Sequence, residues 1–128
     1  MPALVDDLLS LLQTHRLVRS LRTVHYDETP AGKVELKVRC RLPRGYELQL
    51  WLHHEPACRD YAYQLFSGRP FLRWDNAPHY SNIATAPHHF HNESGNVSAS
   101  TLCGDPLLDL PYVLAEIEGW MTRHQGNV

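Results

Sequence analysis

Several features that define whole classes of protein are missing from this sequence of 128 residues. No apolar run approaches the roughly 18 residues that a membrane-spanning helix needs, so we expect no contact with a membrane. The first residues lack the basic segment and the apolar core of a signal peptide, and we expect a cytoplasmic protein. The three cysteines lie far apart without a Cys-x-x-Cys motif, which argues against a disulfide framework and a zinc knuckle.

The composition is that of an ordinary globular protein, with 43% hydrophobic and 20% charged residues. Because a chain of this length forms one core, we expect a single domain over residues 1–128. The charges are unevenly placed: residues 16–75 hold eleven Lys or Arg against seven acids, while both ends are acidic. This excess of four positive charges suits either a solvated sheet face or a positive surface for a phosphate backbone.

Hydrophobic periodicity predicts a helix near each end of the chain, over residues 2–14 and from Pro111 to about His124. Because proline is tolerated in the first turn of a helix, we expect the second helix to begin near Asp109 and not at Asp105. Strands are expected at residues 17–26, 33–42, 46–53, 61–67 and 71–76, with 97–99 as a sixth strand or a loop. Poor alternation in the first strand indicates a bulge or an edge position. The predicted fold is α+β, an antiparallel meander of five to six strands with the helices packed on the sheet.

The loop between the second and third strands determines their register. A two-residue loop would place the apolar face of one strand against the polar face of the other. The three-residue loop Pro43-Arg44-Gly45 instead pairs Cys40 with Leu48 and aligns the two apolar faces. Such loops are commonly a type I turn followed by a left-handed residue, and Gly45 occupies that last position.

With this register, basic residues and an aromatic ring meet on the outer face of the sheet. Lys37 lies opposite Trp51, and Arg39 lies opposite Gln49. Cations beside an exposed aromatic ring can hold a nucleic acid by charge and by base stacking. An ordinary solvated face would show the same pattern. We include Lys37, Arg39 and Trp51 in the predicted substrate-binding residues.

A polar segment stiffened by prolines runs from Arg73 to His91 and holds four of the nine histidines. Loops carried by a rigid scaffold often hold functional residues. A structural role remains open, because Asp75-Asn76-Ala77-Pro78 is also good turn chemistry. Four histidines within thirteen residues nevertheless favour a functional cluster, with either a metal-binding or an acid–base role.

Metal binding would use neutral imidazoles with a carboxylate from Asp75 or Glu93, a set that suits zinc or iron. Residues two apart in an extended chain share a face, so His89 and His91 can share one ion. His79 is the expected third imidazole. Without the fold, this spacing is a weak signal.

Metal-free cleavage of RNA by its own 2′-hydroxyl would need a base, an acid and a cation near the phosphate. Two histidines, one neutral and one protonated, can supply the first two, and the guanidinium of Arg73 the third. Asp75 could orient a histidine, and Asn76 could bind a base edge or the loop backbone. The predicted catalytic residues, with no cofactor, are Arg73, Asp75, His79, His88, His89 and His91. We expect Arg73 and Asp75, which share one strand face, to face His89 and His91.

The segments RWDNAPHY and TAPHHFH resemble the signature of the TumE-type toxin family, which runs R-Y-D-N-A-P-H-H and then T-x-P-H-H-K-H. The matched part covers about a sixth of the chain. The pattern Tyr61-x-Tyr63-Gln64 also fits the family, and Tyr63 joins the expected substrate-binding residues with Asn76. Tyr80 stands where a second histidine is usual. Phe90 replaces the usual lysine, which removes a cation that could have met a phosphate.

The resemblance implies the toxin of a type II toxin–antitoxin pair that blocks translation by cutting RNA, as a metal-independent endoribonuclease. The implied partners are RNA and a cognate helix-turn-helix antitoxin. Trp51 and the Leu-rich first helix each offer a contact for a homodimer. The alternative function is a non-catalytic protein that binds a metal or a partner through the same histidine-rich loop.

Overall fold

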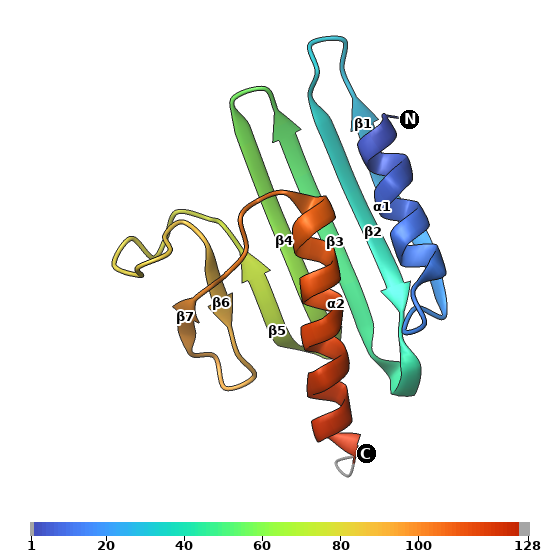
Figure 1. Cartoon of the computed structure of the whole chain (residues 1–128), viewed down its shortest axis with the longest axis vertical. Helices are drawn as coiled ribbons and strands as arrows, with labels where there is room; N and C mark the ends of the chain where they lie inside the picture. The colour runs from blue at the N-terminus through green and yellow to red at the C-terminus, as the bar shows by residue number, and fades with distance from the viewer. Residues whose placement is uncertain (1, 126–128) are drawn as a thin grey trace.

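The computed structural model describes residues 2–125. Within them, seven strands form one antiparallel sheet in which each strand lies beside the next along the chain, with a helix near each end (Figure 1). In chain order the elements are α1 (Ala3–Thr14), β1 (Ser20–Glu28), β2 (Val34–Arg41), the 3₁₀ turn η1 (Pro43–Gly45), β3 (Glu47–Glu55), β4 (Cys58–Ser67), β5 (Arg69–Asp75), β6 (His89–His91), β7 (Val97–Ala99) and α2 (Pro106–Arg123). The predicted α+β fold is confirmed, with more strands than the five to six expected.

Both helices cover the same face of the sheet and bury it (Figure 1). Alternate residues of the central strands point to this face, among them the fully buried Leu36 and Leu50. From α1, Leu8 and Leu12 are buried in the same core, so its most apolar positions are not free for the predicted homodimer contact. Neither helix described between residues 2 and 125 is long and apolar enough to cross a membrane. We call the sheet face turned away from the helices the open face.

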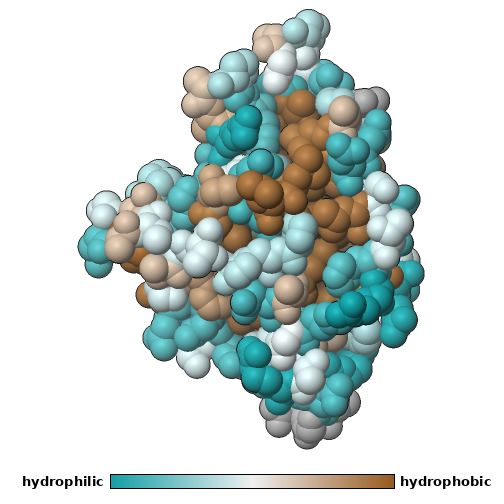
Figure 2. Space-filling view, viewed as in Figure 1, coloured by the Kyte–Doolittle hydropathy of each residue, from teal (hydrophilic) through white to brown (hydrophobic). Residues whose placement is uncertain are grey.

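The start of α2 leaves apolar side chains exposed on the helix-covered side of the molecule. Leu107, Leu108 and Tyr112 are among them, and Leu108 keeps 67% of its surface accessible. Figure 2 shows apolar surface between more hydrophilic regions on this side.

The predicted register of β2 and β3 is confirmed, with Cys40 opposite Leu48 and Lys37 opposite Trp51. Gly45 has the expected left-handed conformation, with φ of 79°. The loop is not the type I turn that is common in such loops, because the residue before this glycine, Arg44, also has a positive φ, of 62°. Two consecutive left-handed residues form a primed turn, whose twist matches the right-handed twist of the strands that it joins.

The weak alternation of the first strand has both of the expected causes. β1 lies at the edge of the sheet, and its register with β2 shifts between Thr23 and His25. The extra residue, Val24, is exposed. The strand runs over Ser20–Glu28, somewhat later than predicted.

The prediction that α2 begins near Asp109 was wrong, since the helix begins at Pro106 with Asp105 as its N-cap. The Asp105 carboxylate accepts a hydrogen bond from Leu107 N at 3.1 Å. The buried Asp109 carboxylate accepts hydrogen bonds from two backbone N–H groups of the preceding loop. Pro111 therefore lies in the second turn, where these caps offset the hydrogen bond that it cannot donate.

The second half of the histidine-rich segment was expected to be a loop, but His89–His91 forms strand β6. It pairs with the end of β5 on one side and with β7 on the other. The Phe90 ring packs against the Trp74 ring, with the centroids 4.9 Å apart, on the core side of the sheet. One apolar residue between two histidines thus anchors this short strand, while backbone pairing provides its hydrogen bonds.

Candidate functional site

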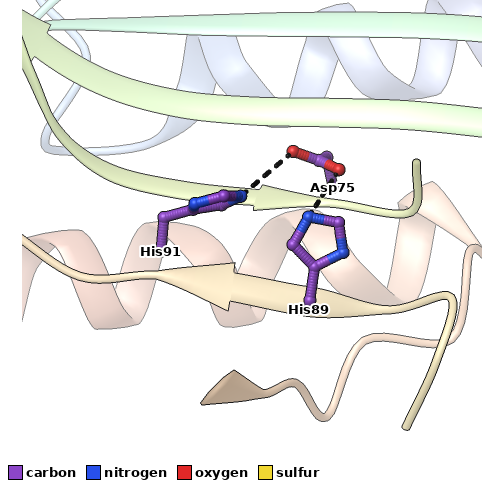
Figure 3. A group of neighbouring side chains, drawn as sticks. All are labelled: Asp75, His89 and His91. Carbon is purple, nitrogen blue, oxygen red and sulfur yellow. Dashed lines mark ion pairs between the residues drawn. The ribbon is translucent and has the colours of Figure 1, made fainter. Parts of the chain in front are cut away.

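The pairing of β5 with β6 brings four polar side chains together on the open face. Arg73 lies opposite His91, and Asp75 lies opposite His89. Residues two apart on a strand share a face, so all four project to the same side. We call Arg73, Asp75, His89 and His91 the site cluster. Figure 3 shows both imidazole rings of β6 turned toward the Asp75 carboxylate.

The Asp75 carboxylate is the centre of the cluster and is almost fully buried, with 7% of its side chain exposed. Its Oδ1 accepts hydrogen bonds from Ala77 N at 3.0 Å and lies 2.9 Å from His89 Nε2. Its Oδ2 lies 2.7 Å from Arg73 Nε. Hydrogen bonds from charged donors are stronger than neutral ones, so this carboxylate is held firmly in one orientation.

His89 is buried beneath its neighbours, with 1% of its side chain exposed. Its Nδ1 lies 2.9 Å from the carbonyl oxygen of Pro87, and its Nε2 faces Asp75. His89 therefore supports the cluster from below and does not itself reach the surface.

His91 is the more accessible imidazole of the pair, and its Nε2 lies 3.7 Å from Asp75 Oδ2. Burial lowers the pKa of His91 from its ordinary value; the charges of His89 and Arg73 lower it further, and the Asp75 charge opposes them. The neutral ring is therefore the main form near pH 7. The ring of Tyr80 packs against the rings of His89 and His91, with centroids 4.7 and 5.6 Å away.

Arg73 is the cation of the cluster and remains accessible, with 39% of its side chain exposed. Asp75 holds its Nε, and the Gln64 side-chain oxygen accepts a hydrogen bond from its Nη1 at 2.9 Å. Because two hydrogen bonds already hold the guanidinium, it can bind an anion with little further loss of side-chain conformational entropy. The cluster thus presents a fixed cation beside a neutral imidazole.

The comparisons with known proteins identify the family. A family model described as Toxin TumE matches residues 8–121, from α1 to α2, and spans the whole site cluster. The chain belongs to the TumE toxin family. No curated protein and no solved structure matches it. Membership gives the chain a toxin role and implies an antitoxin as its partner.

Two other histidines of the TumE signature are not members of the site cluster. His88 lies on the opposite side of the sheet, where its Nδ1 is 2.9 Å from the Tyr61 hydroxyl and the two rings stack. Alternation along an extended chain predicts this separation of His88 from His89 and His91, because neighbouring residues on a strand point to opposite faces. His79 lies exposed on the loop between β5 and β6.

In this TumE toxin, two predicted substrate-binding residues, Tyr63 and Asn76, are engaged in contacts within the protein. Tyr63 has none of its surface exposed and lies in the core under the helices, so the prediction that it contacts substrate was wrong. The Asn76 side chain accepts a hydrogen bond from Tyr61 N at 3.0 Å and donates one to the carbonyl oxygen of Arg59 at 2.7 Å. Of the two predicted roles for Asn76, the structure contains the contact with backbone.

The basic residues of the toxin form a line across the open face that ends at the site cluster. A hollow near the β1 edge is lined by Arg22, Arg39 and Arg41 among others, and a second is lined by Lys37, Trp51 and Arg73 among others. The Arg39 Nε donates a hydrogen bond to the Gln49 side chain at 2.9 Å, as the register predicts. We call Arg22, Arg41, Arg39, Lys37 and Arg73 the basic track.

Sequence reasoning did not assign Gln64 or Tyr80 to the site. Gln64 lies opposite Arg73 in the β4–β5 register, so the predicted strands held a signal once their pairing was known. Tyr80 was noted only because it replaces a usual histidine of the TumE signature. Its contact with both imidazoles depends on how the loop folds back over β6, which local sequence does not encode.

Proposed function

We propose that this toxin inhibits translation by cleaving RNA, with His91 and Arg73 as the groups that touch the substrate. The observation that carries the proposal is the neutral, partly exposed imidazole of His91 opposite the fixed guanidinium of Arg73. A base and a phosphate-binding cation are the two groups that cleavage by the RNA's own 2′-hydroxyl requires first. Asp75 and His89 act through them, because both are buried.

In the proposed reaction, His91 Nε2 takes the proton of a 2′-hydroxyl. The freed oxygen attacks the adjacent phosphorus, and a new bond forms from O2′ to phosphorus. The guanidinium of Arg73 binds the non-bridging oxygens and stabilises the charge that gathers there. The bond from phosphorus to O5′ then breaks, leaving a 2′,3′-cyclic phosphate. His79, exposed on the adjacent loop, is proposed to give the departing O5′ its proton.

The buried pair gives the accessible groups their properties. The Asp75 carboxylate accepts a hydrogen bond from Arg73 Nε at 2.7 Å and so orients that guanidinium, and it lies 3.7 Å from His91 Nε2, where its charge faces the imidazole. His89 in turn fixes the carboxylate from the other side. Groups that are already held in place lose less entropy when the transition state forms, which lowers the barrier of the reaction. Asp75 and His89 are therefore proposed as positioning residues.

The basic track is proposed to hold single-stranded RNA. Lys37 and Arg39 would bind successive phosphates, and the partly exposed Trp51 ring would stack on a base. Single-stranded RNA is favoured because its bases are free to stack on aromatic side chains. The proposal places the toxin in the cytoplasm, with a helix-turn-helix antitoxin that restores growth when both are produced. Trp51 remains the proposed contact if the chain forms a homodimer.

The test combines growth with cleavage. Induced expression should arrest bacterial growth, and purified toxin should cut single-stranded RNA in the presence of a chelator. His91→Ala should relieve the arrest and lower the cleavage rate by about 10²- to 10⁴-fold, the usual effect of removing a general base. His25→Ala, which removes an exposed imidazole on β1, is the matched control and should behave like the parent protein. Normal growth with well-expressed parent protein would refute the proposal.

A metal-binding function is the second candidate, and one observation favours it. Asp75, His89 and His91 each offer a ligand atom, and these atoms lie within 4.8 Å of one another. Two histidines and a carboxylate suit zinc or iron. Against this, Arg73 Nε and Ala77 N already engage the Asp75 oxygens, so an ion would have to displace a cation from the same carboxylate.

Metal analysis separates the two candidates. Toxin purified without a histidine tag is titrated with zinc or ferrous iron in a calorimeter, beside the double variant His89→Ala and His91→Ala. Stoichiometric binding that the double variant loses, with no RNA cleavage by the parent protein, would establish the second function. Cleavage that continues in chelator, with weak or no binding, would support the first.

A further inference from the structure

A third hollow on the open face adjoins the site cluster on the side of β3 and β4. Its volume is about 220 Å³, and it is lined by Trp51, Asp60, Ala62, Arg73 and Asp75 among others. This is smaller than the roughly 300 Å³ at which pockets for drug-sized ligands begin. A hollow of this size suits one planar ring system.

Asp60 is the carboxylate in this hollow that remains available to a ligand. The carboxylate of Asp75 is held by Arg73, His89 and Ala77, as described above. The side chain of Asn76 is engaged with backbone at both ends. Among residues 2–125, by contrast, the ion pairs at 4.0 Å or less do not involve Asp60. A hydrogen bond to Asp60 raises the pKa of the exposed Cys58 thiol, and a thiol is a weak donor that a stronger one can replace.

The remaining walls suit a flat, uncharged ring. Trp51 lies directly opposite Ala62 in the β3–β4 register, so its large ring stands over a small side chain. The His53 ring contacts it edge-on at 6.1 Å and limits its freedom. A base could enter against the indole while its phosphate stays on Arg73, which lines both this hollow and the basic track.

We propose that this hollow is a guanine-binding pocket, in which the base stacks on Trp51 and its Watson–Crick edge binds the Asp60 carboxylate. This inference rests on the proposed function, because it names the base that the RNA presents beside the cut. An ionised carboxylate offers acceptors only. Guanine presents two neighbouring N–H donors, N1–H and N2–H, to both carboxylate oxygens. Adenine and cytosine present one donor beside an acceptor, and uracil presents one donor between two carbonyl groups.

The test uses short oligouridine strands with a single guanine, adenine or cytosine, incubated with the full-length protein. The parent protein should cut next to guanine about 10- to 100-fold faster than next to the other bases, the range that one good bidentate contact gives. Asp60→Asn offers one donor and one acceptor, so its preference should move from guanine to adenine or cytosine. Trp51→Ala should slow cutting at every base, and Trp51→Phe should restore most of the rate. Asp27→Asn, an exposed acid on β1, is the control and should keep the guanine preference.

Binding distinguishes failure of this inference from failure of the cleavage proposal. The affinity of His91→Ala for the same strands is measured by fluorescence anisotropy. Guanine-selective binding that Asp60→Asn abolishes would support the pocket even if the parent protein cuts no RNA. Cleavage or binding without a guanine preference, or a preference that survives Asp60→Asn in folded protein, would overturn it. Absence of any RNA binding would overturn both proposals.

Discussion

The buried contact between Asp75 and His89 should be strongly coupled in folding. Their side chains are 7% and 1% exposed, and Oδ1 lies 2.9 Å from Nε2. Removing one partner of a buried polar contact leaves the other partner buried and unsatisfied, which typically costs about 1–3 kcal/mol or more. We expect losses of this size for Asp75→Ala and for His89→Ala. A domain is stable by only about 5–15 kcal/mol, so either loss takes a large share of the total.

A double-mutant cycle measures the coupling. Once one partner is gone, the second substitution removes a group that is already unsatisfied. The double variant should therefore lose clearly less unfolding free energy than the two single variants lose together. Urea unfolding followed by tryptophan fluorescence gives the four free energies. The pair Arg16–Glu118 is the control, because its short contact of 2.6 Å lies at the surface and solvent screens it. Additive effects of Asp75→Ala and His89→Ala, within about 0.5 kcal/mol, would refute the coupling.

Three further predictions use other parts of the molecule. His91 must be neutral to act as a base, and burial lowers its pKa. As the pH is lowered, kcat/KM should therefore begin to fall only below pH 6.5, the ordinary pKa of histidine being about 6.5. A decrease that begins above this pH would contradict the role of His91. Lys37→Ala should weaken RNA binding alike for all sequences and reduce the slope of log affinity against log salt by about 0.7; an unchanged slope would remove Lys37 from the track. Asp105→Ala should lower the unfolding free energy by about 1 kcal/mol without changing cleavage, and a loss of activity in folded protein would count against a purely capping role.

Periodicity predicted those parts of the fold where one strong pattern acts alone. The β2–β3 hairpin alternates over many residues, and only one loop length aligns its apolar faces. The same rule of alternation separated His88 from His89 and His91 and placed Arg73 and Asp75 on one face. The direction of side chains along a strand, which backbone geometry fixes, determines all of these features.

The remaining features depend on contacts between distant segments. Strand β6 has three residues, too few for a period, and it exists because β5 offers an edge and Trp74 offers a surface for Phe90. The helix α2 begins before the position predicted from Pro111, because Asp105 caps its first turn and Asp109 accepts hydrogen bonds from the preceding loop. Tyrosine is a residue type that often contacts ligands, but the position of Tyr63 along β4 points its side chain to the core face of the sheet.

The short strand β6 has a consequence for how the toxin loses activity. It supplies both imidazoles of the site cluster, yet only three residue pairs join it to β5 and three more join it to β7. Segments held by few backbone hydrogen bonds open with a free energy below that of global unfolding. Amide protons of β6 should therefore exchange with solvent before those of β2–β4. In the proposed mechanism, the fraction of active toxin then depends on the stability of this corner, and a folded but inactive population can exist while the rest of the sheet is intact.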